Sequence, residues 1–108
     1  MNESLDITVK QHQELAALLS RYLPDVEVWA FGSRVKCSAR PTSDLDLVIF
    51  TTPEQQARIA EIREAFAESS LPFRVDLHVW RKLPESFRKN IEAEYIVLQK
   101  AGASGRLG

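Results

Sequence analysis

The chain has 108 residues, of which 44% are hydrophobic and 27% are charged, and its formal net charge is −1. This length and composition fit one small globular domain and leave no room for two. A general nucleic-acid binder is usually basic, so the charge argues against direct binding of nucleic acid. No stretch has the roughly 20 apolar residues of a membrane span, and residues 1–11 contain no apolar run typical of a signal peptide. We therefore expect a cytoplasmic protein without a membrane segment, and the single cysteine, Cys37, fits a reducing compartment.

Helical and strand-like patterns alternate along the chain. The predicted elements are, in chain order, a helix over residues 8–22, a strand over 26–31, a strand over 44–50, a helix over 53–68, a strand over 73–80 and a helix over 84–100. The last helix is predicted from an early proline and from apolar residues at helical spacing, namely Pro84, Phe87, Ile91, Tyr95 and Leu98. This order indicates an α/β domain over residues 1–100, with helices packed on a sheet. Residues 101–108 are glycine-rich and predict a flexible tail.

Gly32 is the only glycine before residue 102, and Ser33 follows it at the end of a predicted strand. A glycine allows a sharp turn that exposes backbone N–H groups, and a serine adds a hydroxyl donor. Donors at the end of a strand suit phosphate oxygens, so the pair is a candidate nucleotide-binding turn. The alternative is a plain turn, and the two residues alone do not decide between them.

The loop after this turn is cationic. Arg34, Lys36 and Arg40 lie between residues 34 and 43, and this stretch contains no acid. In a slightly acidic protein such a loop suits a triphosphate, and Arg34 joins Gly32 and Ser33 as a candidate nucleotide-binding residue. Taken alone, the loop also fits an ordinary solvated connection.

Asp44 and Asp46 are two residues apart on a predicted strand. Side chains alternate along a strand, so both carboxylates are expected on one face, with Leu45 and Leu47 on the other. Neighbouring carboxylates repel each other unless a cation lies between them, and Mg²⁺ pairs carboxylates with substrate phosphates. The alternative is that two acids at the start of a strand simply cap its solvated edge, and for an isolated Asp-x-Asp this is the more common case.

Asp76 is an acid within the otherwise apolar strand predicted over residues 73–80. A buried carboxylate needs a partner, and a metal ion shared with Asp44 and Asp46 would provide one. His78 is expected on the same face, but a lone histidine is more often structural or solvated. Donors, cations and paired carboxylates together are what a metal-bound triphosphate requires.

Gly32 and Ser33, followed after ten residues by Asp44-Leu45-Asp46, resemble the signature of the polymerase-β-type nucleotidyltransferase superfamily. More narrowly, the chain resembles the minimal nucleotidyltransferase (MNT) domains, from the first helix to the last. The resemblance implies a mixed sheet flanked by helices, with Gly32 and Ser33 at the triphosphate. It also implies that Asp44, Asp46 and Asp76 hold Mg²⁺, as two ions, and that Asp76 is the base.

The resemblance also implies a partner. MNT proteins pair with helical proteins of the HEPN type, and in some pairs the MNT protein silences a toxic ribonuclease by transferring AMP from ATP to one of its tyrosines. This chain has no room for an acceptor domain, so the acceptor is expected to be a partner protein, or to be held by a partner or a second copy. Many family members carry a second glycine where this chain has Cys37, which leaves its affinity for triphosphate open.

Two alternatives to an adenylyltransferase antitoxin remain open. One is an antitoxin that blocks its partner by contact alone, against which the three acids speak. The other is the catalytic half of a two-subunit enzyme that modifies a small molecule such as an aminoglycoside. The sequence does not distinguish them, and it leaves a homo-oligomer open.

Overall fold

The computed structural model describes residues 5, 7–35 and 43–102 of the chain. Within this part the helices and strands are, in chain order, α1 (Val9–Tyr22), β1 (Val28–Phe31), β2 (Leu45–Ile49), α2 (Gln56–Ala67), β3 (Val75–Val79), α3 (Glu85–Ala93) and β4 (Ile96–Gln99). The sequence-based expectations for Lys36, Cys37 and Arg40 lie outside the described residues. None of the helices in the described part is both long and apolar enough to cross a membrane.

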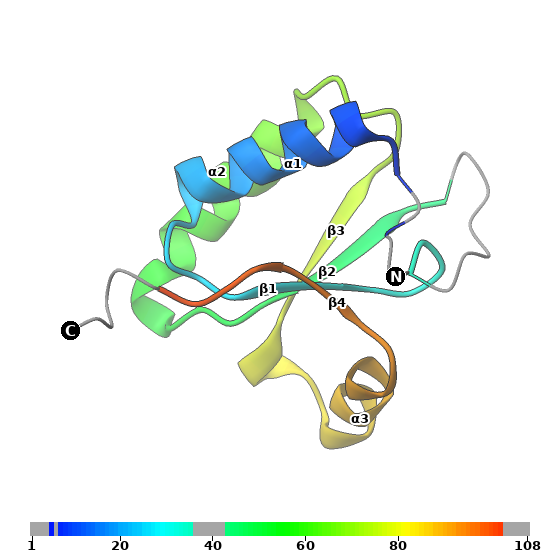
Figure 1. The fold of residues 1–108 in the computed structure, drawn as a ribbon. Helices are drawn as coiled ribbons and strands as arrows, with labels where there is room; N and C mark the ends of the chain where they lie inside the picture. The colour runs from blue at the N-terminus through cyan, green and yellow to red at the C-terminus, as the bar shows by residue number, and fades with distance from the viewer. Residues whose placement is uncertain (1–4, 6, 36–42, 103–108) are drawn as a thin grey trace.

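The four strands form one mixed sheet in the order β3-β2-β1-β4. β1 is antiparallel to both β2 and β4, whereas β2 and β3 are parallel. α1 and α2 cover one face of this sheet and α3 lies against the other (Figure 1). The expected α/β domain with a mixed sheet flanked by helices is confirmed.

α1 begins at a capping box. Thr8 accepts a hydrogen bond from the Gln11 backbone N–H, and the Gln11 side chain accepts one from the Thr8 backbone N–H. The two bonds satisfy donors that a helix start otherwise leaves unpaired. Leu15 and Leu19 then point into the core from one side of the helix, so the sequence fixes both where α1 starts and which side it buries.

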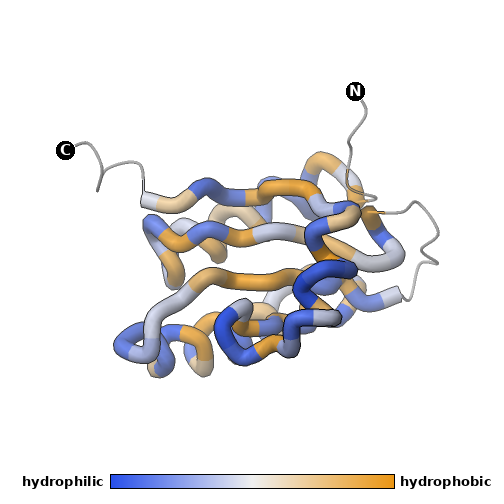
Figure 2. The backbone as a smooth tube through the Cα atoms, turned by 90° about the horizontal axis from the view of Figure 1, so that it is seen from below, coloured by the Kyte–Doolittle hydropathy of each residue, from blue (hydrophilic) through white to orange (hydrophobic). Residues whose placement is uncertain are grey.

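The main core lies between the sheet and the two helices α1 and α2. Its fully buried members include Leu45, Leu47 and Ile49 from β2, and Ile59 and Ile62 from α2. Seen from below the view of Figure 1, the backbone in the centre is hydrophobic over much of its length, whereas hydrophilic segments lie toward the periphery (Figure 2). The alternation expected for β2 is confirmed, with its leucines and isoleucine in the core and Asp46 on the other face.

The predicted helix over residues 84–100 is wrong in its second half. α3 ends at Ala93, and Ile96–Gln99 forms β4, which pairs with β1. Ile96 and Leu98 pack against the core while Val97 is exposed, which is the period of two of a strand. Pairing also gives backbone partners to β1, which would otherwise be an open sheet edge. The spacing of Tyr95 and Leu98 fits a helix as well, and tertiary pairing decides between the two.

The second face of the sheet carries an aromatic cluster beneath α3. Its buried members are Phe31, Val48 and Ile91, and its partly buried members are Trp29, Phe50, Trp80, Leu83 and Phe87. Tyr95 is 39% exposed and stacks on Trp29, with ring centroids 3.9 Å apart. α3 therefore covers only part of this face, and the uncovered part carries the polar side chains of Asp46, Asp76 and His78.

Candidate active site

Asp46 and Asp76 lie side by side at the start of the two parallel strands. They are direct register partners in the β2–β3 pair, so both side chains leave the sheet on the face opposite the main core. The Asp46 side chain is 28% exposed and that of Asp76 is 48% exposed. The structure thus brings together two carboxylates that are 30 residues apart in the sequence.

His78 completes this group. Its Nε2 atom lies 3.7 Å from Oδ2 of Asp76 and 4.0 Å from Oδ1 of Asp46. The ring packs beside those of Phe31 and Phe87, with centroids 5.5 and 6.0 Å away. The aromatic cluster therefore holds the imidazole in place beside the carboxylates.

Gly32 lies directly against Asp46. Its φ angle is +90°, a conformation that favours glycine, and a Cβ atom built there would lie 2.5 Å from Oδ2 of Asp46. The glycine is therefore required both by the turn and by the close approach of the carboxylate. Ser33 follows within the same turn and is partly exposed, and the Val35 N–H closes the turn on the Gly32 carbonyl.

Asp44 lies just before β2 and interacts with a different residue. Its Oδ2 atom lies 3.3 Å from a guanidinium nitrogen of Arg74, whose side chain is 76% exposed. An exposed ion pair of this kind contributes little to stability, so another cation can readily replace Arg74 beside Asp44. Asp44 is thus close to the carboxylate pair in sequence, but in this structure its carboxylate contacts Arg74.

Arg34 is buried rather than exposed to a ligand. Its guanidinium donates from Nε and from a terminal nitrogen to the carbonyl oxygen of Ser43, at 3.1 and 2.9 Å, and it lies 4.3 Å from the centre of the Phe73 ring. These contacts join the two ends of the loop that separates Gly32 from Asp44. The geometry favours a role in holding this loop, and direct contact of Arg34 with a nucleotide stays a prediction.

Burial raises the pKa of the Asp46 carboxyl above its ordinary value, because the ionised form loses hydration. The nearby His78 opposes this effect and lowers the pKa, whereas the charges of Asp76 and Asp44 raise it further. A cation at this position would relieve both the lost hydration and the repulsion.

The residues present fit a divalent metal ion. Asp46, Asp76 and His78 each offer one ligand atom, and these atoms lie within 4.8 Å of one another. Carboxylate oxygens are the ligands that Mg²⁺ takes in proteins, usually together with water and substrate phosphates. The predicted roles of Asp46 and Asp76 as ligands are thus compatible with the geometry, and Asp44 would join them by leaving Arg74.

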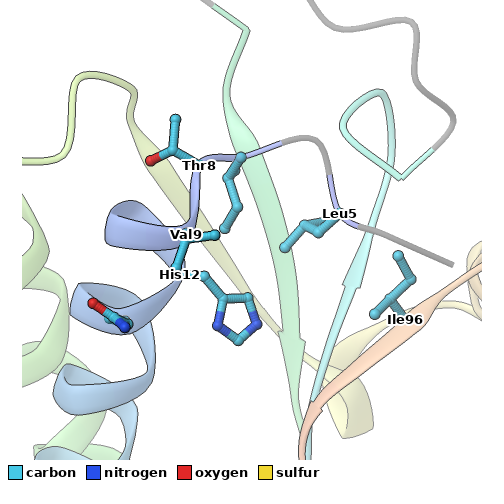
Figure 3. Close-up of a pocket in the computed structure, with 7 residues that line it drawn as sticks. Leu5, Thr8, Val9, His12 and Ile96 are labelled. Carbon is cyan, nitrogen blue, oxygen red and sulfur yellow. The ribbon is translucent and has the colours of Figure 1, made fainter. Parts of the chain in front are cut away.

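A hollow of about 490 Å³ lies elsewhere, between the start of α1 and β4. Leu5, Thr8, Val9, His12 and Ile96 are among the residues that line it (Figure 3). None of its lining residues belongs to the carboxylate group. The side chains of Asp46 and Asp76 are themselves partly exposed, so a second molecule can reach them.

Two contacts of this region are not visible in the sequence. The alternation along β3 predicts His78 on the face of Asp76, but it gives no sign that the imidazole lies beside both carboxylates. Arg74 contacts Asp44 across 30 positions of the chain. The sequence pattern carries no signal for that pair without knowledge of the β2–β3 register.

The chain is similar in sequence to known proteins. A family model described as nucleotidyltransferase domain matches residues 12–98. The chain is 43% identical over 97 residues to the probable protein adenylyltransferase MntA of Haemophilus influenzae, which covers 89% of this chain and 85% of that protein.

Solved structures share the fold. One is a crystal structure of a toxin–antitoxin with AMP-PNP, with a TM-score of 0.65 at 19% identity over 89% of this chain and 78% of that chain. Another is a tri-AMPylated Shewanella oneidensis HEPN toxin in complex with MNT antitoxin, with a TM-score of 0.53 at 15% identity over 91% of this chain and 76% of that chain. At these identities the likeness establishes the fold alone, and the predicted nucleotidyltransferase fold is confirmed. Because the family model spans most of the chain and the relative from Haemophilus is 43% identical, this chain belongs to the nucleotidyltransferase domain family.

Proposed function

We propose that this chain is an antitoxin that transfers AMP from ATP to a tyrosine hydroxyl of a HEPN-type toxin partner. The observation that carries the proposal is the contact of the Gly32 turn with Asp46, beside Asp76. A turn suited to phosphates therefore lies next to Asp46 and Asp76, whose carboxylates suit a metal ion. Its relative MntA is named a probable protein adenylyltransferase, which supports ATP as the donor and a protein as the acceptor.

Each residue has a distinct task in this proposal. The Gly32 turn and Ser33 bind triphosphate oxygens through N–H and hydroxyl donors. Asp44, Asp46 and Asp76 hold Mg²⁺, which when bound neutralises the triphosphate and aligns it. Asp76, the most exposed of the three, accepts the proton of the acceptor hydroxyl. The acceptor oxygen then bonds to the α-phosphorus, the bond to the bridging oxygen breaks, and pyrophosphate leaves.

The open placement of the carboxylates supports an acceptor that belongs to another protein. Two large apolar residues near the site face, Tyr95 and Val97, are each 39% exposed. Among the residues that the structure describes, β4 is also an edge strand, and its outer backbone groups have no sheet neighbour there. Structures of this fold were crystallised as toxin–antitoxin complexes, which supports a toxin as the partner.

The proposal is tested by label transfer. The chain is co-expressed with a HEPN-type protein encoded beside it and supplied with Mg²⁺ and ATP labelled at the α-phosphate. We expect label on the partner, its loss with Asp46→Asn, and its retention with Glu92→Gln, an exposed acid on α3 that serves as the matched control. Replacement of the partner's labelled tyrosine by phenylalanine should abolish the label and keep the toxin active.

Two other outcomes would replace this proposal. A stable complex that silences the toxin without label, and that Asp46→Asn leaves intact, would establish an antitoxin acting by contact alone. Label on a free small molecule in the absence of any protein acceptor would establish a small-molecule enzyme.

A further inference from the structure

His78 occupies a position that the proposed mechanism does not use. Its Nε2 atom is within 4.0 Å of one oxygen from each of Asp46 and Asp76. The rings of Phe31 and Phe87 pack near the imidazole, whose nitrogen lies beside the carboxylates. Asp44, by contrast, directs an oxygen to Arg74. In this structure the side chain that converges with Asp46 and Asp76 is an imidazole, and the group contains two oxygen donors and one nitrogen donor.

The spacing of these atoms fits a shared ion. Small divalent ions such as Mg²⁺ and Zn²⁺ bond to nitrogen and oxygen at about 2.0–2.2 Å. Two ligand atoms of one ion therefore lie at most about 4.4 Å apart. Both distances from the His78 nitrogen, 3.7 and 4.0 Å, fall within that limit. They are also longer than a hydrogen bond, which leaves room for an ion between the atoms. An ion can thus bond to His78 and to either carboxylate without movement of the ring.

The type of donor determines which ion is preferred. Mg²⁺ strongly favours oxygen ligands, whereas imidazole nitrogen suits first-row transition ions, whose affinities rise from Mn²⁺ to Cu²⁺. We propose that His78 is a nitrogen ligand of the metal held by Asp46 and Asp76, and that it gives this site a preference for a transition ion such as Mn²⁺ over Mg²⁺. The inference rests on the proposed function only in that both use the same carboxylates, and it concerns which ion they hold.

Pulsed electron paramagnetic resonance of Mn²⁺ added to the full-length protein tests the ligand directly. A histidine nitrogen bonded to Mn²⁺ gives a ¹⁴N modulation that carboxylates and water do not give. We expect this modulation in the wild type, its loss in His78→Gln, and its retention in His12→Gln, because His12 lies on α1 away from the carboxylates. Bound Mn²⁺ without ¹⁴N modulation in the wild type would overturn the inference.

Calorimetric titration with Mn²⁺ and with Mg²⁺ tests the preference. His78→Gln should lower the affinity for Mn²⁺ about tenfold or more and change the affinity for Mg²⁺ much less. His78→Asp makes the group all-oxygen, so it should keep Mg²⁺ binding and reduce the ratio of Mn²⁺ to Mg²⁺ affinity. Equal ratios in the wild type and in both variants, with folding verified by circular dichroism, would contradict the proposal.

These measurements need no ATP and no partner. A ¹⁴N modulation without any label transfer would support the nitrogen ligand and count against the proposed function. Label transfer with bound Mn²⁺ that shows no modulation would do the reverse. The two proposals can therefore fail separately.

Discussion

The two faces of the sheet differ in what they do. On the face beneath α1 and α2, β2 contributes Leu45, Leu47 and Ile49, all fully buried. On the other face the same strand contributes Asp46, which is partly exposed beside Asp76 and His78. Because side chains alternate along one strand, a single backbone supplies a close-packed core on one side and charged groups on the other. The covered face stabilises the fold, and its rigidity positions the groups on the open face.

The largest effect on stability is expected on the covered face. Leu47→Ala should lower the free energy of unfolding by about 2–5 kcal/mol, because it leaves a cavity between the sheet and the helices. Val97→Ala, at an exposed position on the open face, should change it by less than about 0.5 kcal/mol. Chemical denaturation of both variants checks this contrast. Equal losses would mean that the two faces share the stabilising role.

Gly32→Ala should break the link between the two strands that meet at the site. The added Cβ would collide with Oδ2 of Asp46, and the alanine would have to adopt a φ angle of +90°. Backbone strain of this kind costs about 1–3 kcal/mol. We also expect weaker binding of Mg²⁺, since the carboxylate must move.

A double-mutant cycle separates the two causes of the Gly32→Ala effect. In an Asp46→Ala background the collision is absent, so the cost of Gly32→Ala should fall to the backbone strain alone. Ser33→Ala, in the same turn but without a positive φ angle, is the matched control. An unchanged cost in the Asp46→Ala background would show that the collision contributes nothing.

The same comparison of faces explains how much the sequence predicts. On the covered face the signal is local, because the apolar period of α1 and the alternation in β2 follow directly from the residue order. The candidate acids Asp44 and Asp46 are predictable for a similar reason, since Asp44-Leu45-Asp46 and Gly32-Ser33 form a motif with fixed spacing.

The contacts that were not predicted all depend on tertiary pairing. The pairing of β4 with β1, the contact of Arg74 with Asp44 and the burial of Arg34 against Phe73 join segments far apart in the chain. Residues 96–99 fit a helix and a strand about equally well, and only the open edge of β1 decides between them. The convergence of His78 with both carboxylates likewise requires the parallel register of β2 and β3.

Asp46→Asn should stabilise the metal-free protein while it removes activity. Since burial and the neighbouring acids raise the pKa of Asp46, its ionisation opposes folding, and this penalty is absent below its ordinary pKa of 3.8 and complete above the raised value. At pH 7 the amide removes the penalty, so we expect about 0.5–2 kcal/mol of added stability. Thermal melting with and without Mg²⁺ checks this. Mg²⁺ should raise the melting temperature of the wild type only, and a destabilised Asn variant would contradict the prediction.

The smallest effect is expected from Glu14, which joins α1 to the segment that follows α2. Its carboxylate accepts hydrogen bonds from the Ser70 hydroxyl at 2.6 Å and from the Ser70 N–H at 3.0 Å, and these bonds lower its pKa below the ordinary value of 4.5. A lowered pKa in the folded state adds stability that is present above pH 4.5 and lost as the pH falls through the folded value. The wild type should therefore be more stable than Glu14→Gln at pH 7, and the difference should vanish in acid. Urea denaturation from pH 7 to pH 3 measures this, with Glu92→Gln on α3 as the control for loss of a charge alone. A difference between wild type and Glu14→Gln that does not change with pH would show that the contact stabilises the fold through packing rather than through charge. The Glu14 side chain would then stabilise the covered face in the same way as its apolar neighbours.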